Sequence, residues 1–126
     1  STYGVRASVP FDFIVGDQTV HAGKITARGV TASNSGPLSI TNLSSGQHTF
    51  RMATQILSAS DSTQAKLVFR KYGDRYFLAQ VCIPGYKAWE VSKSKSERAL
   101  ERESKLAQNS AAKHAAELVT VVAEMQ

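Results

Sequence analysis

The chain has 126 residues, of which 42% are hydrophobic and 20% are charged, and its formal net charge is +5. This length suits one domain with a single core, and the composition is typical of folded globular proteins rather than of disordered, collagen-like or coiled-coil chains. No apolar run approaches the roughly 20 residues that a transmembrane helix needs. Cys82 is the one cysteine, which excludes an intramolecular disulfide and a cysteine-based zinc site.

Residues 5–15 alternate apolar side chains with other side chains at a period of two. The apolar set at the odd positions is Val5, Ala7, Val9, Phe11, Phe13 and Val15. This alternation predicts a strand with one buried face. Pro10 has no N–H for a ladder, so we expect this strand at a sheet edge or bulged at Pro10. Gly16-Asp17 followed by a short QTV indicates a hairpin.

Three more alternating pieces follow, each bounded by Gly, Asn, Ser or Pro. They are Ile25 with Ala27, Leu38 with Ile40, and Phe50 with Met52 and Ile56. Residues 58–65 are small and polar, and we expect an exposed loop there. Short strands with such regular punctuation predict an antiparallel sandwich or barrel that hides every second side chain.

Residues 70–81, RKYGDRYFLAQV, predict a tight hairpin that turns at Gly73-Asp74. In an antiparallel register around this turn, Tyr72 faces Arg75, Lys71 faces Tyr76, and Phe69 faces Leu78. One face, expected in the core, then carries Leu67, Phe69, Tyr76, Leu78 and Cys82. The other face carries Val68, Arg70, Tyr72, Arg75, Phe77, Ala79 and Val81.

The composition changes at residues 92–117 to Ala, Leu, Glu, Lys, Arg and Gln without Gly or Pro, which favours a helix. Its apolar stripe is narrow, so we expect it to lie on the surface or to project, with Asn109-Ser110 as a candidate interruption. Residues 118–126 return to β-branched side chains and indicate either a docked helix end or, as we favour, a final strand.

The predicted fold is therefore one mainly β domain, residues 1–126. It is an antiparallel sandwich or partly closed barrel of six to eight strands in residues 1–91, followed by one long charged helix and a returning last strand.

No motif or spacing in the sequence singles out a group of catalytic residues. The chain has neither a Gly-x-Ser-x-Gly elbow nor a glycine-rich phosphate loop. His21, His48 and His114 are too scattered for a local metal motif, and we expect them to face solvent. We expect no enzyme, no metal and no cofactor. Cys82 is expected to pack in the core, and the alternative is an intermolecular disulfide or a reactive thiol.

Cations and aromatics alternate on the predicted outer side of the 70–81 hairpin, at Arg70, Tyr72, Arg75 and Phe77. Such a face can stack on bases or sugars and neutralise anions, so these four are the candidate ligand-binding residues. The alternatives are that they pack against the helix, or that cross-strand pairs merely stabilise a solvent face.

The segments VPFDFIVGDQTVHAGKITAR and AKLVFRKYGDRYFLAQV, with the charged segment after them, resemble a family of short exported proteins of acidobacterial genomes. The matching positions are Pro10-Phe11-Asp12-Phe13, Val15-Gly16, Ala22-Gly23 and residues 72–78. His21 stands where the family tends to have Pro, and Ile25 where an aromatic is common. The resemblance implies export after removal of a signal peptide and brings no activity with it. The Ser1 start fits either a processed mature chain or a trimmed one.

We expect a non-catalytic module that binds or assembles in the periplasm or outside the cell. One expected partner is a second copy of the chain, in a homo-oligomer formed through the helix. One alternative is a carrier of a small apolar ligand, in a cavity lined by Phe11, Phe13, Phe69 and Leu78. Another is weak binding of an anionic polymer by the basic β part. No specific nucleic-acid binding is expected, because glutamates nearly cancel the basic residues of the helical segment.

Overall fold

The computed structural model describes residues 4–30, 35–62, 64–108 and 117–125, and within them the chain forms eleven strands and one helix. The elements are β1 (Gly4–Val9), β2 (Phe13–Val15), β3 (Gln18–Val20), β4 (Gly23–Gly29), β5 (Ser35–Asn42), β6 (His48–Ser62), β7 (Lys66–Tyr72), β8 (Arg75–Cys82), β9 (Gly85–Val91), α1 (Lys95–Gln108), β10 (Glu117–Val122) and β11 (Glu124–Met125). The predicted class, mainly β with one helix and a returning last strand, is confirmed. The strand number is higher than predicted because the chain breaks its ladders at Pro10 and at Ala123.

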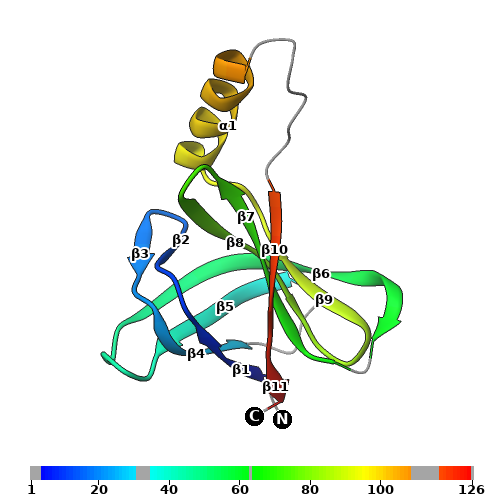
Figure 1. The fold of residues 1–126 in the computed structure, drawn as a ribbon. Coiled ribbons are helices and arrows are strands. Elements are labelled where there is room, and N and C mark those ends of the chain that lie inside the picture. The colour runs from blue at the N-terminus through cyan, green and yellow to red at the C-terminus, as the bar shows by residue number, and fades with distance from the viewer. Residues whose placement is uncertain (1–3, 31–34, 63, 109–116, 126) are drawn as a thin grey trace.

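The strands form one curled sheet that is not closed (Figure 1). Its order is β10-β7-β8-β9-β6-β5-β4-β1-β11, and β2 pairs with β3 and, at one position, with β8. β10 and β11 stand at opposite ends of this order, yet only Ala123 separates them in the chain. The C-terminal segment 117–125 therefore contacts both edges of the sheet, and we call it the strap.

The core fills the inside of the curled sheet. Of the predicted odd-numbered set, Val5, Ala7, Val9, Phe13 and Val15 are buried, while Phe11 is partly buried. The ring of Phe69 meets those of Phe11 and Phe13 edge to face, with centroids 5.0 Å apart in both pairs. Each such buried side chain contributes about 1.5–3 kcal/mol. The side chains expected to line a ligand cavity, Leu78 included, thus pack in one cluster.

The β7–β8 hairpin has the predicted register, with Tyr72 opposite Arg75 and Phe69 opposite Leu78. Gly73 adopts a φ of 63°, which the turn requires. Farther along, the pairing shifts between Val68 and Phe69, so that Val68 lies opposite Gln80.

This β-bulge reverses which face the end of β8 presents. Val81, predicted on the other face, joins the main core, whereas Cys82 packs with Val68 and Ala88 in a second small cluster. The predicted core face was therefore wrong for Cys82. The thiol is nevertheless buried, and this burial raises its pKa. A packing role is consistent with that environment.

β6 departs from two expectations. Residues 58–62, predicted as a loop, belong to this strand, because pairing with β9 extends as far as Ser62 opposite Gly85. In addition, the apolar side chains of Phe50 and Met52, predicted to be buried, point away from the core. Thr49 pairs with the buried Ile40, so the neighbouring Phe50 points outward.

α1 lies inside the predicted 92–117 segment and stands beyond one end of the sheet, next to the β7–β8 hairpin (Figure 1). The Oγ of Ser94 accepts a hydrogen bond from the backbone N–H of Glu97 at 3.1 Å, which caps its first turn. The candidate interruption at Asn109-Ser110 lies outside the described residues. Among the described residues, no helix has both the length and the apolar character needed to cross a membrane.

Candidate functional site

The four predicted site residues do not share one exposed face. Tyr72 and Phe77 are only 7% and 3% exposed, and their rings meet edge to face with centroids 5.6 Å apart. The Arg70 side chain is only 13% exposed and is bound to Glu97 of α1, so Arg75, at the hairpin turn, is the one exposed residue of the four. The alternative prediction, packing against the helix, is confirmed for Arg70 and Tyr72.

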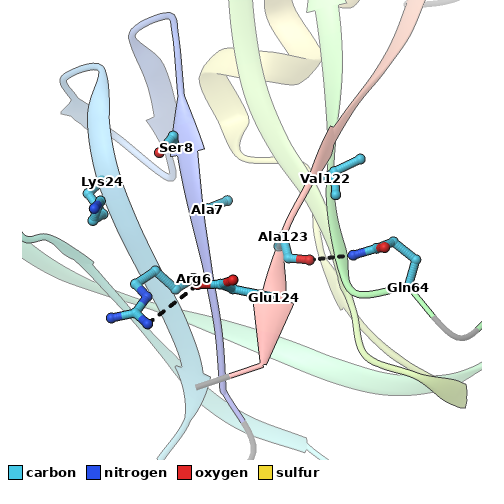
Figure 2. A pocket seen from close by; sticks show the side chains of 8 residues that line it. All are labelled: Arg6, Ala7, Ser8, Lys24, Gln64, Val122, Ala123 and Glu124. Carbon is cyan, nitrogen blue, oxygen red and sulfur yellow. Dashed lines mark hydrogen bonds and ion pairs between the residues drawn. The ribbon is translucent and has the colours of Figure 1, made fainter.

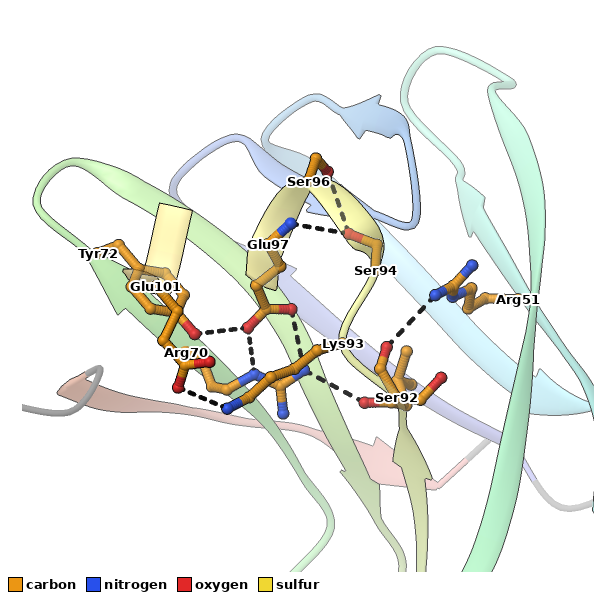
Figure 3. A network of polar contacts seen from close by, with 10 residues as sticks. Arg51, Arg70, Tyr72, Ser92, Lys93, Ser94, Ser96, Glu97 and Glu101 are labelled. Carbon is orange, nitrogen blue, oxygen red and sulfur yellow. Dashed lines mark hydrogen bonds and ion pairs between the residues drawn. The ribbon is translucent and has the colours of Figure 1, made fainter. Parts of the chain in front are cut away.

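Glu97 is the partner of both residues (Figure 3). Its carboxylate, only 3% exposed, accepts hydrogen bonds from Nε of Arg70, from Nη2 of Arg70 at 3.1 Å and from the Tyr72 hydroxyl at 2.8 Å. Nη2 of Arg70 also donates to the carbonyl of Val91 at 3.2 Å. A bidentate pair that is buried and further hydrogen-bonded joins α1 to the sheet.

The pKa values around this anchor follow from the same contacts. Burial raises the pKa of Tyr72, and so does the neighbouring Glu97 carboxylate, which would repel a phenolate. One turn along the helix, Lys93 donates to Glu101 at 2.7 Å and lowers the pKa of that carboxyl group. The chain therefore supplies its own counter-charges here, and Arg70 has little left to offer an anion.

A different surface is open to solvent, on the outer side of β4, β5 and β6. Two cross-strand rows build it: Arg28, Ser39 and Phe50 in one, and Thr26, Thr41 and His48 in the next. With Gly29, Val30 and Leu43, these residues line a depression of about 580 Å³. We call this surface the outer face. Sequence reasoning did not select it.

Large apolar side chains on the outer face lack cover. Phe50 is 57% exposed, and Val30 and Leu43 are also exposed; Met52, two positions farther along β6 and so on the same side of the sheet as Phe50, is 60% exposed. The His48 ring meets Phe50 at a centroid distance of 4.5 Å, and its Nε2 lies 2.7 Å from the Ser39 hydroxyl. Clustered exposed apolar groups of this kind mark interaction sites more often than isolated ones do.

Basic residues extend the outer face toward the strap (Figure 2). Arg6 pairs across β1 and β4 with Thr26, and Lys24 pairs with Ser8. A second depression of about 540 Å³ is lined by Arg6, Ser8 and Lys24 together with Ala7, Gln64, Val122, Ala123 and Glu124. Arg6 meets Glu124 at 3.4 Å, whereas the side chains of Lys24 and Arg28 have no carboxylate partner among the described residues.

The remaining titratable candidates are scattered. His21 lies 3.5 Å from Asp12 in an exposed turn, where the backbone N–H of Ala22 and then His21 lower the pKa of Asp12. His48 lies on the outer face, and His114 lies outside the described residues. In the ranges that the structure describes, no three His, Cys, Asp or Glu side chains come together as a metal site.

The outer face belongs to a curled antiparallel sheet with a helix at one end. No family model, no curated protein and no solved structure matches the chain. Function must therefore be argued from the residues themselves.

Proposed function

We propose that this protein is a non-catalytic, exported binding module whose contact surface is the outer face. The observation that carries the proposal is the set of large apolar side chains, led by Phe50 and Met52, that stays exposed beside Arg28 and His48. Water contact with such groups is unfavourable, and a bound partner would remove it. Export is supported by the residues that resemble the acidobacterial family.

Catalysis has weaker support, although Ser39 and His48 stand at the distance of a nucleophile and its base. Such a pair also needs a group that orients the imidazole and N–H donors that stabilise an oxyanion. Within the described parts of the chain, Nδ1 of His48 has no such partner. Ser39 sits in the middle of β5, between the ladders to β4 and β6 that engage the backbone.

An NMR titration of the ¹⁵N-labelled protein tests the proposal. The panel contains a polyuronate, a neutral glucan, a single-stranded oligonucleotide and vesicles of anionic lipid. We expect at least one of them to shift the amide signals of Ser39, Thr41 and Phe50 while those of α1 stay in place. The sample is then followed for hours, and the bound ligand should remain chemically unchanged.

Two results would contradict this function. Shifts confined to the β7–β8 turn around Arg75, or to α1, would move the contact surface elsewhere. Turnover of a ligand that disappears in a Ser39→Ala variant would make the protein an enzyme. A Ser96→Ala variant serves as the matched control, because Ser96 is an exposed serine on α1 and does not line the outer face.

A further inference from the structure

We infer that the outer face binds an anionic polysaccharide, a chain of sugar rings that carry carboxylate or sulfate groups. This inference rests on the proposed function and adds the class of ligand. Three features carry it: a track of cations, an exposed ring beside them, and hydroxyl groups between them.

The cations form a track over neighbouring strands. Arg6 on β1 and Lys24 and Arg28 on β4 all project from the outer side of the sheet. Adjacent strands lie about 4.8 Å apart, so the four neighbouring strands β1, β4, β5 and β6 span about 14 Å. This width is enough for a short run of sugar units. Glu124 is the carboxylate that lines this track, and it pairs with Arg6 at the strap end.

The exposed ring lies at the other end of the track. Phe50 is more than half exposed, and the edge-to-face contact with His48 leaves it able to stack with the apolar side of a sugar ring. His48 in turn is oriented by Ser39. Phe50 lies beside Ser39 and Ser39 beside Arg28, so a stacked ring would bring its acidic group near the guanidinium.

Hydroxyl side chains occupy the floor between the cations and the ring. Thr26, Ser39 and Thr41 line the depression, and each hydroxyl has one donor and two acceptor positions, of which Ser39 shares one with His48. Sugar hydroxyls match such groups. A nucleic acid would instead favour successive aromatic platforms, and among the described residues of this surface Phe50 and His48 are the only rings. A lipid surface would favour an apolar wedge over a polar-floored depression.

The test uses polygalacturonate and its methyl-esterified form, which share a backbone and differ in charge. We expect the acidic polymer to bind the protein in affinity electrophoresis and the esterified polymer to bind at least about tenfold more weakly. The affinity for the acidic polymer should fall roughly tenfold between about 50 and about 200 mM salt, because counterions are released on binding.

Variants place the site. Arg28→Gln should weaken binding roughly fivefold to tenfold, and Phe50→Ala roughly tenfold. Matched controls on α1 are Arg102→Gln, which removes the same charge, and Leu106→Ala, which removes an exposed apolar group. Both controls should bind like the parent protein. Circular dichroism of every variant confirms that it is folded.

Each other outcome is decisive. Equal binding of the two polymers, with Phe50→Ala weakened and Arg28→Gln unchanged, overturns the anionic part and leaves the proposed function standing. Tighter binding of the oligonucleotide, lost in the same variants, overturns the sugar class. Absence of any shift on the outer face in the NMR panel overturns the proposed function, and this inference falls with it.

Discussion

Two regions of the molecule combine a cation, an aromatic ring and hydroxyl groups, and only one is available to a ligand. At the helix anchor, Arg70 and Tyr72 are both bound to Glu97 and lie away from solvent. On the outer face, Arg28 and Phe50 lie in solvent without a carboxylate beside them in the described structure. Residue type alone therefore does not define a binding surface. The decisive property is whether the chain brings its own counter-charge.

The largest effect is expected from Glu97→Gln. The substitution keeps the shape of the side chain but leaves the largely buried guanidinium of Arg70 without its paired carboxylate, which should lower the free energy of unfolding by about 3 kcal/mol. Urea denaturation followed by circular dichroism measures this change. Glu103→Gln on the exposed side of α1 is the control, and it should stay within about 0.5 kcal/mol of the parent. A Glu97→Gln protein as stable as that control would mean that the anchor does not hold the helix.

Tyr72→Phe removes one hydrogen bond to the same carboxylate, and we expect a loss of about 1–2 kcal/mol. The pH dependence carries the sharper signature. Folding raises the pKa of Tyr72 above its ordinary value of 10.0, so its contribution is intact below that pH and declines as the pH rises above it. The variant should therefore lose less stability than the parent on the alkaline side.

Measurements of unfolding free energy against pH, combined with a tyrosinate absorbance titration, check this expectation. In the parent, one tyrosine should ionise at a higher pH than the others, and this part of the absorbance change should be missing from the variant. Parallel alkaline profiles for the two proteins would show that Tyr72 ionises as readily in the folded state as in the unfolded state.

Gly73→Ala tests the turn that carries the anchor residues. A Cβ at this position would meet no atom within 4 Å, so the substitution acts through the backbone φ of 63° alone. We expect a loss of about 1 kcal/mol in thermal or urea unfolding. Asp74→Ala is the neighbouring control and should change stability less. A Gly73→Ala variant as stable as the parent would contradict the assigned turn conformation.

The smallest effect on stability is expected on the outer face. Because Phe50 is mostly exposed, Phe50→Ala should change the free energy of unfolding by less than about 0.5 kcal/mol while it weakens ligand binding. Urea denaturation and the electrophoretic assay, run on one preparation, separate the two properties. A loss above 2 kcal/mol would assign this ring a structural role instead.

Local patterns in the sequence were sufficient for much of the fold. The alternation in residues 5–15, the Gly73-Asp74 turn and the helical composition after residue 92 each predicted an element that the structure contains. The bulge that moves Cys82 to the other face could not be predicted, because it depends on how β8 fits both β7 and β9. Residues 58–62 form part of β6 for a similar reason, because they extend its pairing with β9, which lies more than 20 positions farther along the chain.

The candidate site was harder to find for a related reason. A period of two in β6 indicates one apolar face but not whether that face points inward, and the register against β5 turned Phe50 outward. At the anchor, Arg70 and Glu97 are 27 positions apart, which no local rule connects. The Ser94-x-x-Glu97 pattern, typical of a helix start, was the one readable cue to the position of that carboxylate.

The strap has a consequence for how the protein folds. Arg6 and Glu124 are paired although 118 positions separate them, so the strap covers β1 and β7 only after most of the polypeptide has been synthesised. Contacts between such distant positions are formed slowly, since a long loop must close before they are gained. Until then, β1 and β7 each present an unsatisfied edge that a neighbouring nascent chain could pair with. Chaperone binding before the last strand docks would protect those edges.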